Sequence, residues 1–208
     1  MAITSPQKGK RKMRGFRIGL VLVAALSVTF PAFAGWQDQA SSFDSGRLAK
    51  LDEARAKGLS EAQAGRDIGL IHAVLDAEAR PASPRSLEGD WRCRSIKLGG
   101  MTPDIVYSWF RCRIGRVGDR LYFSKLNGTQ RLNGVLYPHE SGGFVLLGAL
   151  SAKGEPPHRY SGNGPSAGAK VTPDDTIGLL QSTGHSSARI EFPYPVQEST
   201  FDVIELKR

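Results

Sequence analysis

The chain contains two cysteines, and they lie in two short stretches of similar sequence. "GDWRCRSIKLGG" (89–100) and "SWFRCRIG" (108–115) each place an aromatic residue directly before Arg-Cys-Arg. Two cysteines can bind a metal, carry out thiol redox chemistry or form a structural disulfide. There is no CxxC spacing, and no histidine cluster stands beside them to complete a tetrahedral zinc site. The pattern therefore predicts a Cys93–Cys112 disulfide, worth about 3 kcal/mol in the chain-entropy model, with no metal and no cofactor.

Other residues with chemical potential are scattered. The four histidines (His72, His139, His158 and His185) show neither HExxH nor HxH spacing. "GHSSA" (184–188) lacks the final glycine of a nucleophile elbow. We therefore assign no catalytic residue and favour a protein that is not an enzyme. A deep pocket in which Asp174, Glu155 or a histidine converges would favour an enzyme instead.

Residues 1–34 have the pattern of a secretory signal peptide. Six lysines and arginines without an acid precede the apolar run 18–30, and Ala32 and Ala34 form a small-x-small cleavage site. The apolar run is shorter than the ~20 residues that span a bilayer as a helix. We expect cleavage after Ala34, no stable membrane span afterwards, and a periplasmic or secreted protein. Such compartments are oxidising, which favours the disulfide.

Removal of that segment changes the charge of the protein. The whole chain has a formal charge of +8, but the six cations before residue 35 account for most of it. The remaining 22 lysines and arginines face 20 acids, so the mature chain carries only +2. Because nucleic-acid binding requires a strongly basic surface, this balance argues against a nucleic-acid partner.

Residues 35–80 read as a helical segment. Apolar residues at three- and four-residue spacing in the stretches 43–58 and 60–80 predict two helices, or one broken helix, with Gly58 just past the end of the first. The proline-containing stretch 80–86 then separates this segment from a domain over 87–208 whose sequence pattern is not helical.

The domain 87–208 reads as a chain of short strands joined by tight turns. The strand-like runs are 87–98, 105–117, 120–126, 130–137, 143–150, 176–181, 188–192 and 200–206. Asn127-Gly128 is a strong hairpin signal. The longest interruption, 151–175, is rich in Gly, Pro and Ser, and its role stays open. The pattern predicts a mainly β fold, an antiparallel meander of about eight strands that closes into a small barrel.

Alternation along the strands divides the residues around the cysteines between two faces. Trp91, Phe110 and Ile114 share the inner face with the cysteines. The outer face receives Trp109 and the arginines Arg92, Arg94, Arg111 and Arg113. These arginines form either a solvated surface or a patch that binds an anion or a partner. The hairpin residues Lys125, Gln130 and Arg131 extend such a patch if their hairpin lies beside it.

"SLEGDW" resembles the opening of calycin-type barrels. In that superfamily a Gly-x-Trp on the first strand, here Gly89 and Trp91, seals one end of the barrel. The resemblance implies a basic residue packed across the tryptophan, for which Lys207 or Arg208 is suitable. Small secreted inhibitors of metalloproteases have such a barrel with a single disulfide. The present chain departs from them in its longer helical segment.

Longer strings resemble a family of uncharacterised secreted proteins of Gram-negative bacteria, domain-of-unknown-function family 4893. They include "WRCRSIKLGG", "VYSWFRCRI", "LYFSKLNGTQRLNGVLYP" and "ESTFDVIELKR". The resemblance implies a signal peptide and the same fold, and it brings no activity, ligand or catalytic residue.

Two classes of function follow from these observations. The first is an exported, non-enzymatic envelope protein: a calycin-like barrel, stapled by a disulfide, that binds an anionic ligand or an unknown partner protein. The alternative is a small periplasmic hydrolase or carbohydrate-active enzyme with its site at the barrel mouth.

Overall fold

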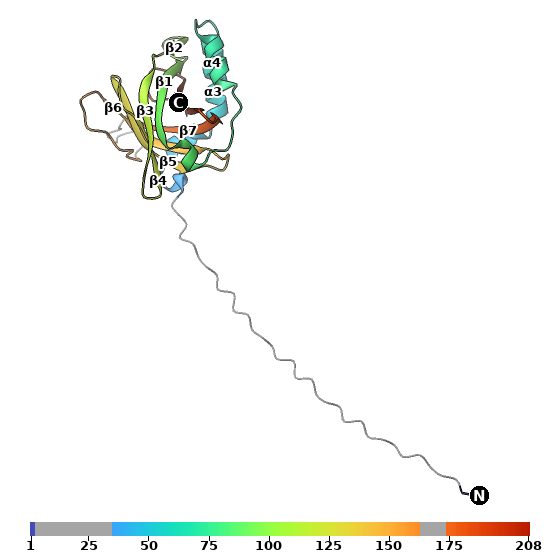
Figure 1. Cartoon of the computed structure of the whole chain (residues 1–208). Helices are drawn as coiled ribbons and strands as arrows, with labels where there is room; N and C mark the ends of the chain where they lie inside the picture. The colour runs from blue at the N-terminus through green and yellow to red at the C-terminus, as the bar shows by residue number, and fades with distance from the viewer. Residues whose placement is uncertain (3–34, 163–173) are drawn as a thin grey trace. The chain divides into compact units, whose positions relative to one another are not determined.

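The computed structural model describes residues 1–2, 35–162 and 174–208, and the fold lies within the compact unit 34–208. The proposed signal peptide (all but its first two residues) and residues 163–173 of the long interruption lie outside the described residues. The strands in the described part are β1 (Gly89–Leu98), β2 (Asp104–Val106), β3 (Phe110–Val117), β4 (Arg120–Lys125), β5 (Gln130–Pro138), β6 (Phe144–Ala152), β7 (Asp175–Gly184), β8 (Ser187–Pro193) and β9 (Phe201–Lys207) (Figure 1).

The strands form the predicted antiparallel barrel. Each strand from β3 to β9 pairs with the next along the chain, and β1 closes the ring by pairing with both β3 and β9. The closed barrel has eight strands, and β2 is an extra strand on β1. The predicted run 105–117 is therefore wrong as one strand. Residues 107–109 interrupt it, because its first part pairs with the end of β1 and its second part with the beginning.

The two cysteines are joined by the predicted disulfide. Cys93 lies opposite Phe110 in the β1–β3 ladder, so the bond reaches diagonally to Cys112 over a Cα–Cα distance of 5.8 Å. Both cysteines are buried, whereas Arg92 and Arg111 on the same strands are exposed. The predicted division between inner and outer faces is confirmed for these strands.

The interior of the barrel is packed with apolar side chains at the end where β1 begins. Trp91 is only 4% exposed, and its indole Nε1 donates a hydrogen bond of 2.8 Å to the carbonyl oxygen of Leu87. The guanidinium of Arg208 lies over the ring, 4.3 Å from its centroid. Arg208 is therefore the basic residue that packs across the tryptophan and helps to close this end.

The described helices are α1 (Trp36–Gln39), α2 (Ser42–Leu48), α3 (Leu51–Ala62), α4 (Ile68–Leu75) and α5 (Pro84–Leu87). The longer pair, α3 and α4, packs on the outside of the barrel against β1 and β9, beside Ile96 and Phe201 (Figure 1). Helix α2 covers β7 in the same way. None of the described helices is long and apolar enough to cross a membrane.

Gly58 does not end a helix, as its residue type suggested. It lies inside α3, where an added Cβ would come within 2.7 Å of the Cβ of Phe201 and 3.3 Å of that of Leu98. The glycine permits close approach of the helix to the barrel wall. Tertiary contact therefore explains this residue better than helix termination does.

Buried ion pairs also attach the helices to the barrel. The carboxylate of Glu191 on β8 is fully buried and receives Arg55 from α3 and Arg189 from its own strand. Arg189 also donates to the carbonyl oxygens of Val74 and Ala77 near the end of α4. This network holds α3 and α4 against one side of the barrel.

Candidate functional site

The inner face of β1 changes character along its length. Trp91 and Cys93 belong to the apolar core, whereas the next inward residues are Ser95 and Lys97. In the β1–β9 register, Cys93 lies opposite Leu206, but Lys97 lies opposite Asp202. The barrel therefore has an apolar packed end and a polar end, which we call the mouth.

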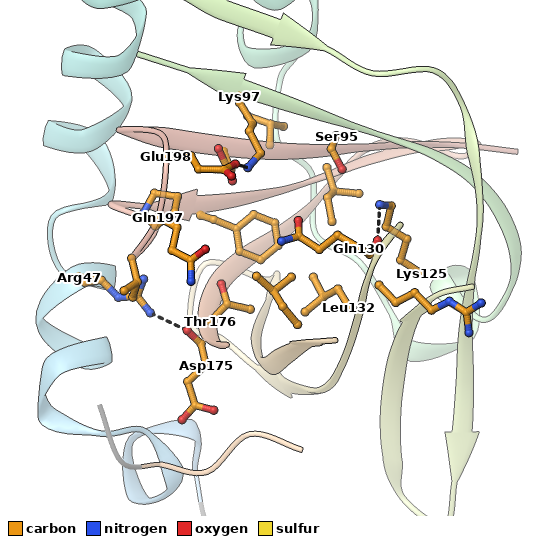
Figure 2. A pocket seen from close by; sticks show the side chains of 18 residues that line it. Arg47, Ser95, Lys97, Lys125, Gln130, Leu132, Asp175, Thr176, Gln197 and Glu198 are labelled. Carbon is orange, nitrogen blue, oxygen red and sulfur yellow. Dashed lines mark hydrogen bonds and ion pairs between the residues drawn. The ribbon is translucent and has the colours of Figure 1, made fainter. Parts of the chain in front are cut away.

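The mouth is hollow. A pocket there has a volume of about 730 Å³, including the part that is open to solvent. Figure 2 shows side chains from distant parts of the chain that surround it. Its lining includes Arg47, Ser95, Lys97, Lys125, Gln130, Arg131, Leu132, Asp175, Thr176, Phe192, Gln197, Glu198 and Asp202. The pocket thus combines charged groups with an apolar floor.

Lys97 stands between two carboxylates. Its Nζ lies 2.5 Å from Oε2 of Glu198, which belongs to the connection between β8 and β9 (Figure 2). Desolvation lowers the pKa of Lys97, but the hydrogen bond to Glu198 and the charges of Asp202 and Glu198 outweigh it and raise that pKa. The same hydrogen bond lowers the pKa of Glu198. Lys97 therefore stays charged and holds the β8–β9 connection at the mouth.

Asp202 is a half-buried carboxyl group at the same place. Burial raises its pKa to about 6, although a hydrogen bond from Ser199 and the charge of Lys97 act in the opposite direction. The nearby Glu198 has a φ of +72°, which is unfavourable for a residue other than glycine. The connection between β8 and β9 thus enters the site in a constrained conformation that the Lys97 ion pair supports.

Lys125 is the second lysine of the mouth. It is 8% exposed, its Nζ donates a 2.8 Å hydrogen bond to the carbonyl oxygen of Gln130, and it lies 4.1 Å from the ring centroid of Phe110. Desolvation and the charge of Lys97 lower the pKa of Lys125 to about 8. Among the described residues no carboxylate pairs with it. Lys125 is therefore a nearly buried cation without a counter-ion.

Arg47 closes the opposite side of the pocket and is fully engaged. It forms an ion pair with Asp44 within α2 and donates to the carbonyl oxygen of Tyr194 at 3.0 Å. A longer contact of 3.4 Å joins it to the carbonyl oxygen of Asp175 (Figure 2). The side chain of Asp175 accepts from the amides of Ser161 and Gly162. These groups therefore shape the wall of the pocket.

The predicted binding residues separate into two places. Arg92, Arg94, Arg111 and Arg113 lie on the outer wall, and Lys125, Gln130 and Arg131 line the mouth. The hairpin residues do not extend the arginine patch, because Lys125 shares the inner face of β4 with the buried Phe123.

The outer arginine face, which we define as Arg92, Arg94, Arg111, Arg113, Trp109 and Lys207, is built around an aromatic ring. Arg92, Arg94 and Lys207 lie over the indole of Trp109 at 5.3, 4.7 and 5.8 Å from its centroid. Two carboxylates neutralise part of the face, since Glu205 pairs with Arg94 and Lys207, and Asp90 with Arg113. Arg92 lies directly opposite Lys207 on one side and Arg111 on the other. Three cations thus stand side by side across the wall.

The residues named as a sign of enzymatic chemistry meet outside the pocket. Nδ1 of His158 lies 3.1 Å from Oδ2 of Asp174, and its Nε2 lies 3.8 Å from Oε2 of Glu155. All three side chains are at least one third exposed and none lines the mouth. The described part of the chain contains no group of three or more ligating side chains suited to a metal.

A second hollow, of about 700 Å³ including the part that is open to solvent, lies at the packed end. Its lining includes Leu87 and Trp91, which close the barrel there, together with Arg80 and His185. The chemistry of the linings distinguishes the two hollows, because among the described residues the mouth gathers several inward charges, whereas the packed end has Arg80 and His185. The sequence pattern missed Ser95, Lys97, Glu198 and Asp202. Alternation from Cys93 was the available signal for the first two.

Comparison with known proteins identifies the family of the chain and no function. The family model described as "Domain of unknown function (DUF4893)" matches residues 36–206, which include strands β1 to β8 and nearly all of β9. No curated protein matches the chain. The chain therefore belongs to the DUF4893 family, whose function is unknown.

Proposed function

We propose that the protein is an exported, non-enzymatic binding protein that takes a small polar ligand into the mouth of its barrel. One observation carries the proposal: inward-facing charged side chains converge on a pocket at one end of a barrel whose other end is packed and stapled. Charged groups are costly inside a barrel when their only role is packing. A ligand that they bind supplies the reason for their position.

The proposed export rests on separate features. The pattern of residues 1–34 is that of a signal peptide, and the Cys93–Cys112 disulfide suits an oxidising compartment. A periplasmic or secreted location is therefore part of the proposal. Fractionation of cells that produce the full chain checks it, and a protein retained in the cytoplasm with two free thiols would contradict it.

The ligand is tested with protein purified from its own compartment without denaturation. Native mass spectrometry should show a small molecule bound to the folded chain, which gentle heating releases. The matched comparison is a variant in which the mouth is blocked, Ser95→Trp. Equal retention of the small molecule by this folded variant would place the binding elsewhere and contradict the proposal.

An enzyme acting at the mouth is the second candidate, and one observation favours it. Two neighbouring carboxyl groups of the pocket have pKa values shifted in opposite directions, upward for Asp202 through burial and downward for Glu198 through Lys97. Such separation is what a general acid and a general base require. A panel of glycoside and ester substrates tests it. Turnover that Asp202→Asn abolishes would establish this candidate over the first.

The outer arginine face is proposed as a surface for a partner protein with an acidic epitope. Arg92 and Arg111 are exposed and, among the described residues, have no carboxylate partner. A pull-down from periplasmic extract compares the wild type with a variant in which Arg92, Arg94, Arg111 and Arg113 are replaced by serine. Partners that both proteins retain equally would end this proposal.

A further inference from the structure

The charge of the mouth indicates which class of ligand fits it. Both carboxylates at the Lys97 side are already engaged, Glu198 by Lys97 and Asp202 by Ser199 and the facing Lys97. Lys125 has no such partner among the described residues. A lysine ammonium has three donors, and only one is used, toward the carbonyl oxygen of Gln130. Beside Lys97, the unmatched charge is therefore positive.

Neutral donors surround the same space. The side chains of Ser95, Thr176 and Gln197 line the pocket, and none of them forms a hydrogen bond within the described part of the chain (Figure 2). Hydroxyl and amide groups donate to carboxylate and phosphate oxygens. An anion at this position would find charged and neutral donors together, whereas a cation would meet Lys125.

Glu198 is placed as a replaceable partner of Lys97. Its side chain is 56% exposed, so it would be solvated if it left the ion pair. Asp202, the other carboxyl near Lys97, lies within β9 and is paired across the ladder with β1, so it cannot leave in this way. A ligand anion that takes the place of Glu198 keeps Lys97, which is only 13% exposed, paired with a negative charge. The exchange therefore leaves only the solvated Glu198 without a partner.

Resting on the proposed function, we propose that the ligand carries a carboxylate or phosphate group, which binds between Lys97 and Lys125 and displaces the carboxylate of Glu198 from Lys97. Glu198 then acts as an internal competitor of the ligand. The low pKa of Lys125, about 8, agrees with this arrangement, because an anion would stabilise its charged form.

The test is an NMR titration of the amide resonances with probes that differ only in charge. Propionate, propionamide and propylamine share one skeleton, and inorganic phosphate serves as a separate anionic arm. We expect propionate or phosphate to shift the amides of Ser95, Thr176 and Gln197, and the neutral and cationic probes to leave them unchanged. The response of the two anionic arms shows which anion the site prefers.

Variants test the roles of the individual residues. Lys125→Met should weaken binding of the anion about tenfold or more, the effect of a charge-assisted hydrogen bond. Glu198→Gln should tighten it about three- to tenfold, a gain that a folding defect cannot produce. The control Lys50→Met removes an exposed lysine that does not line the pocket and should leave the affinity unchanged.

Failure of this inference is distinguishable from failure of the proposed function. Propionamide or propylamine that shifts the mouth amides when the anions do not would overturn the anionic ligand but leave a polar ligand in the mouth. Glu198→Gln that weakens anion binding would overturn the exchange. If no probe shifts any mouth amide, both the inference and the proposed function fall.

Discussion

The two ends of the barrel interior differ although the same strands build both. On β4, Phe123 is fully buried in the apolar core, and Lys125, two residues later on the same face, lies in the mouth. At the packed end the inward side chains of β1 and β4 belong to the apolar core, whereas at the mouth the same strands contribute the cations Lys97 and Lys125. The packed end therefore stabilises the fold, whereas the charged side chains of the mouth lower its stability. Binding of a ligand at the mouth explains why they are there. Substitutions should therefore have opposite signs at the two ends.

The largest effect is expected at the packed end. Phe123→Ala removes a fully buried ring and leaves a cavity, so the free energy of unfolding should fall by about 3–5 kcal/mol. Urea denaturation measures the change. A loss below about 1 kcal/mol would be far smaller than a buried ring should give. It would show that this end is not tightly packed.

Removal of the Cys93–Cys112 disulfide should cause the second largest loss in the free energy of unfolding. The double variant Cys93→Ala, Cys112→Ala opens a loop with a sequence separation of 19, which should cost about 3 kcal/mol. Thermal and urea unfolding measure the loss, and wild type in reductant is the matched control. Mass spectrometry of the folded, unreduced protein should find no free thiol. Two free thiols would contradict the disulfide.

Asp202 should make the mouth sensitive to pH. Its folded pKa of about 6 is above the ordinary 3.8, so the folded state holds this proton more tightly than the unfolded state. Stability should therefore fall as pH rises from about 4 to about 6, by up to about 2–3 kcal/mol. The Asp202→Asn variant should lack this loss. An equal pH dependence in both proteins would assign it to other groups.

At Lys125 a substitution should stabilise the fold instead of destabilising it. Its pKa of about 8 lies below the ordinary 10.5, so Lys125→Met should raise stability at pH 7 by about 1–2 kcal/mol, an amount reduced by solvent in the open pocket. The gain should disappear as pH rises from about 8 to above 10.5, because the wild type then loses the costly charge. Denaturation across this pH range measures it. Destabilisation by Lys125→Met at pH 7 would place Lys125 among the structural residues.

The smallest effect is expected on the outer arginine face. Arg92 and Arg111 are exposed and face each other as like charges, so replacing both by serine should change stability by at most about 0.5 kcal/mol. Any increase in the free energy of unfolding should be largest at low salt, since salt screens the repulsion between exposed charges. A loss above 2 kcal/mol, far beyond the usual surface effect, would show that the stack on Trp109 is structural.

The sequence predicted the barrel and the faces of β1 and β3 because alternation and the disulfide constrain both. It did not predict which side of the wall Lys125 occupies, since that depends on the position of a hairpin relative to distant strands. Glu198 and Asp202 reach Lys97 only through closure of β9 onto β1. Gly58 was misread for a related reason, because its role lies in a contact with Phe201, far away in the sequence.

The most direct test of the account is a map of where the natural ligand binds. Amide resonances of the ligand-free protein are recorded while the small-molecule fraction of the compartment from which it was purified is added. We predict shifts of Ser95, Lys97, Thr176 and Gln197 at the mouth and none near Trp91 at the packed end. Shifts confined to the packed end or to the outer arginine face would contradict the account.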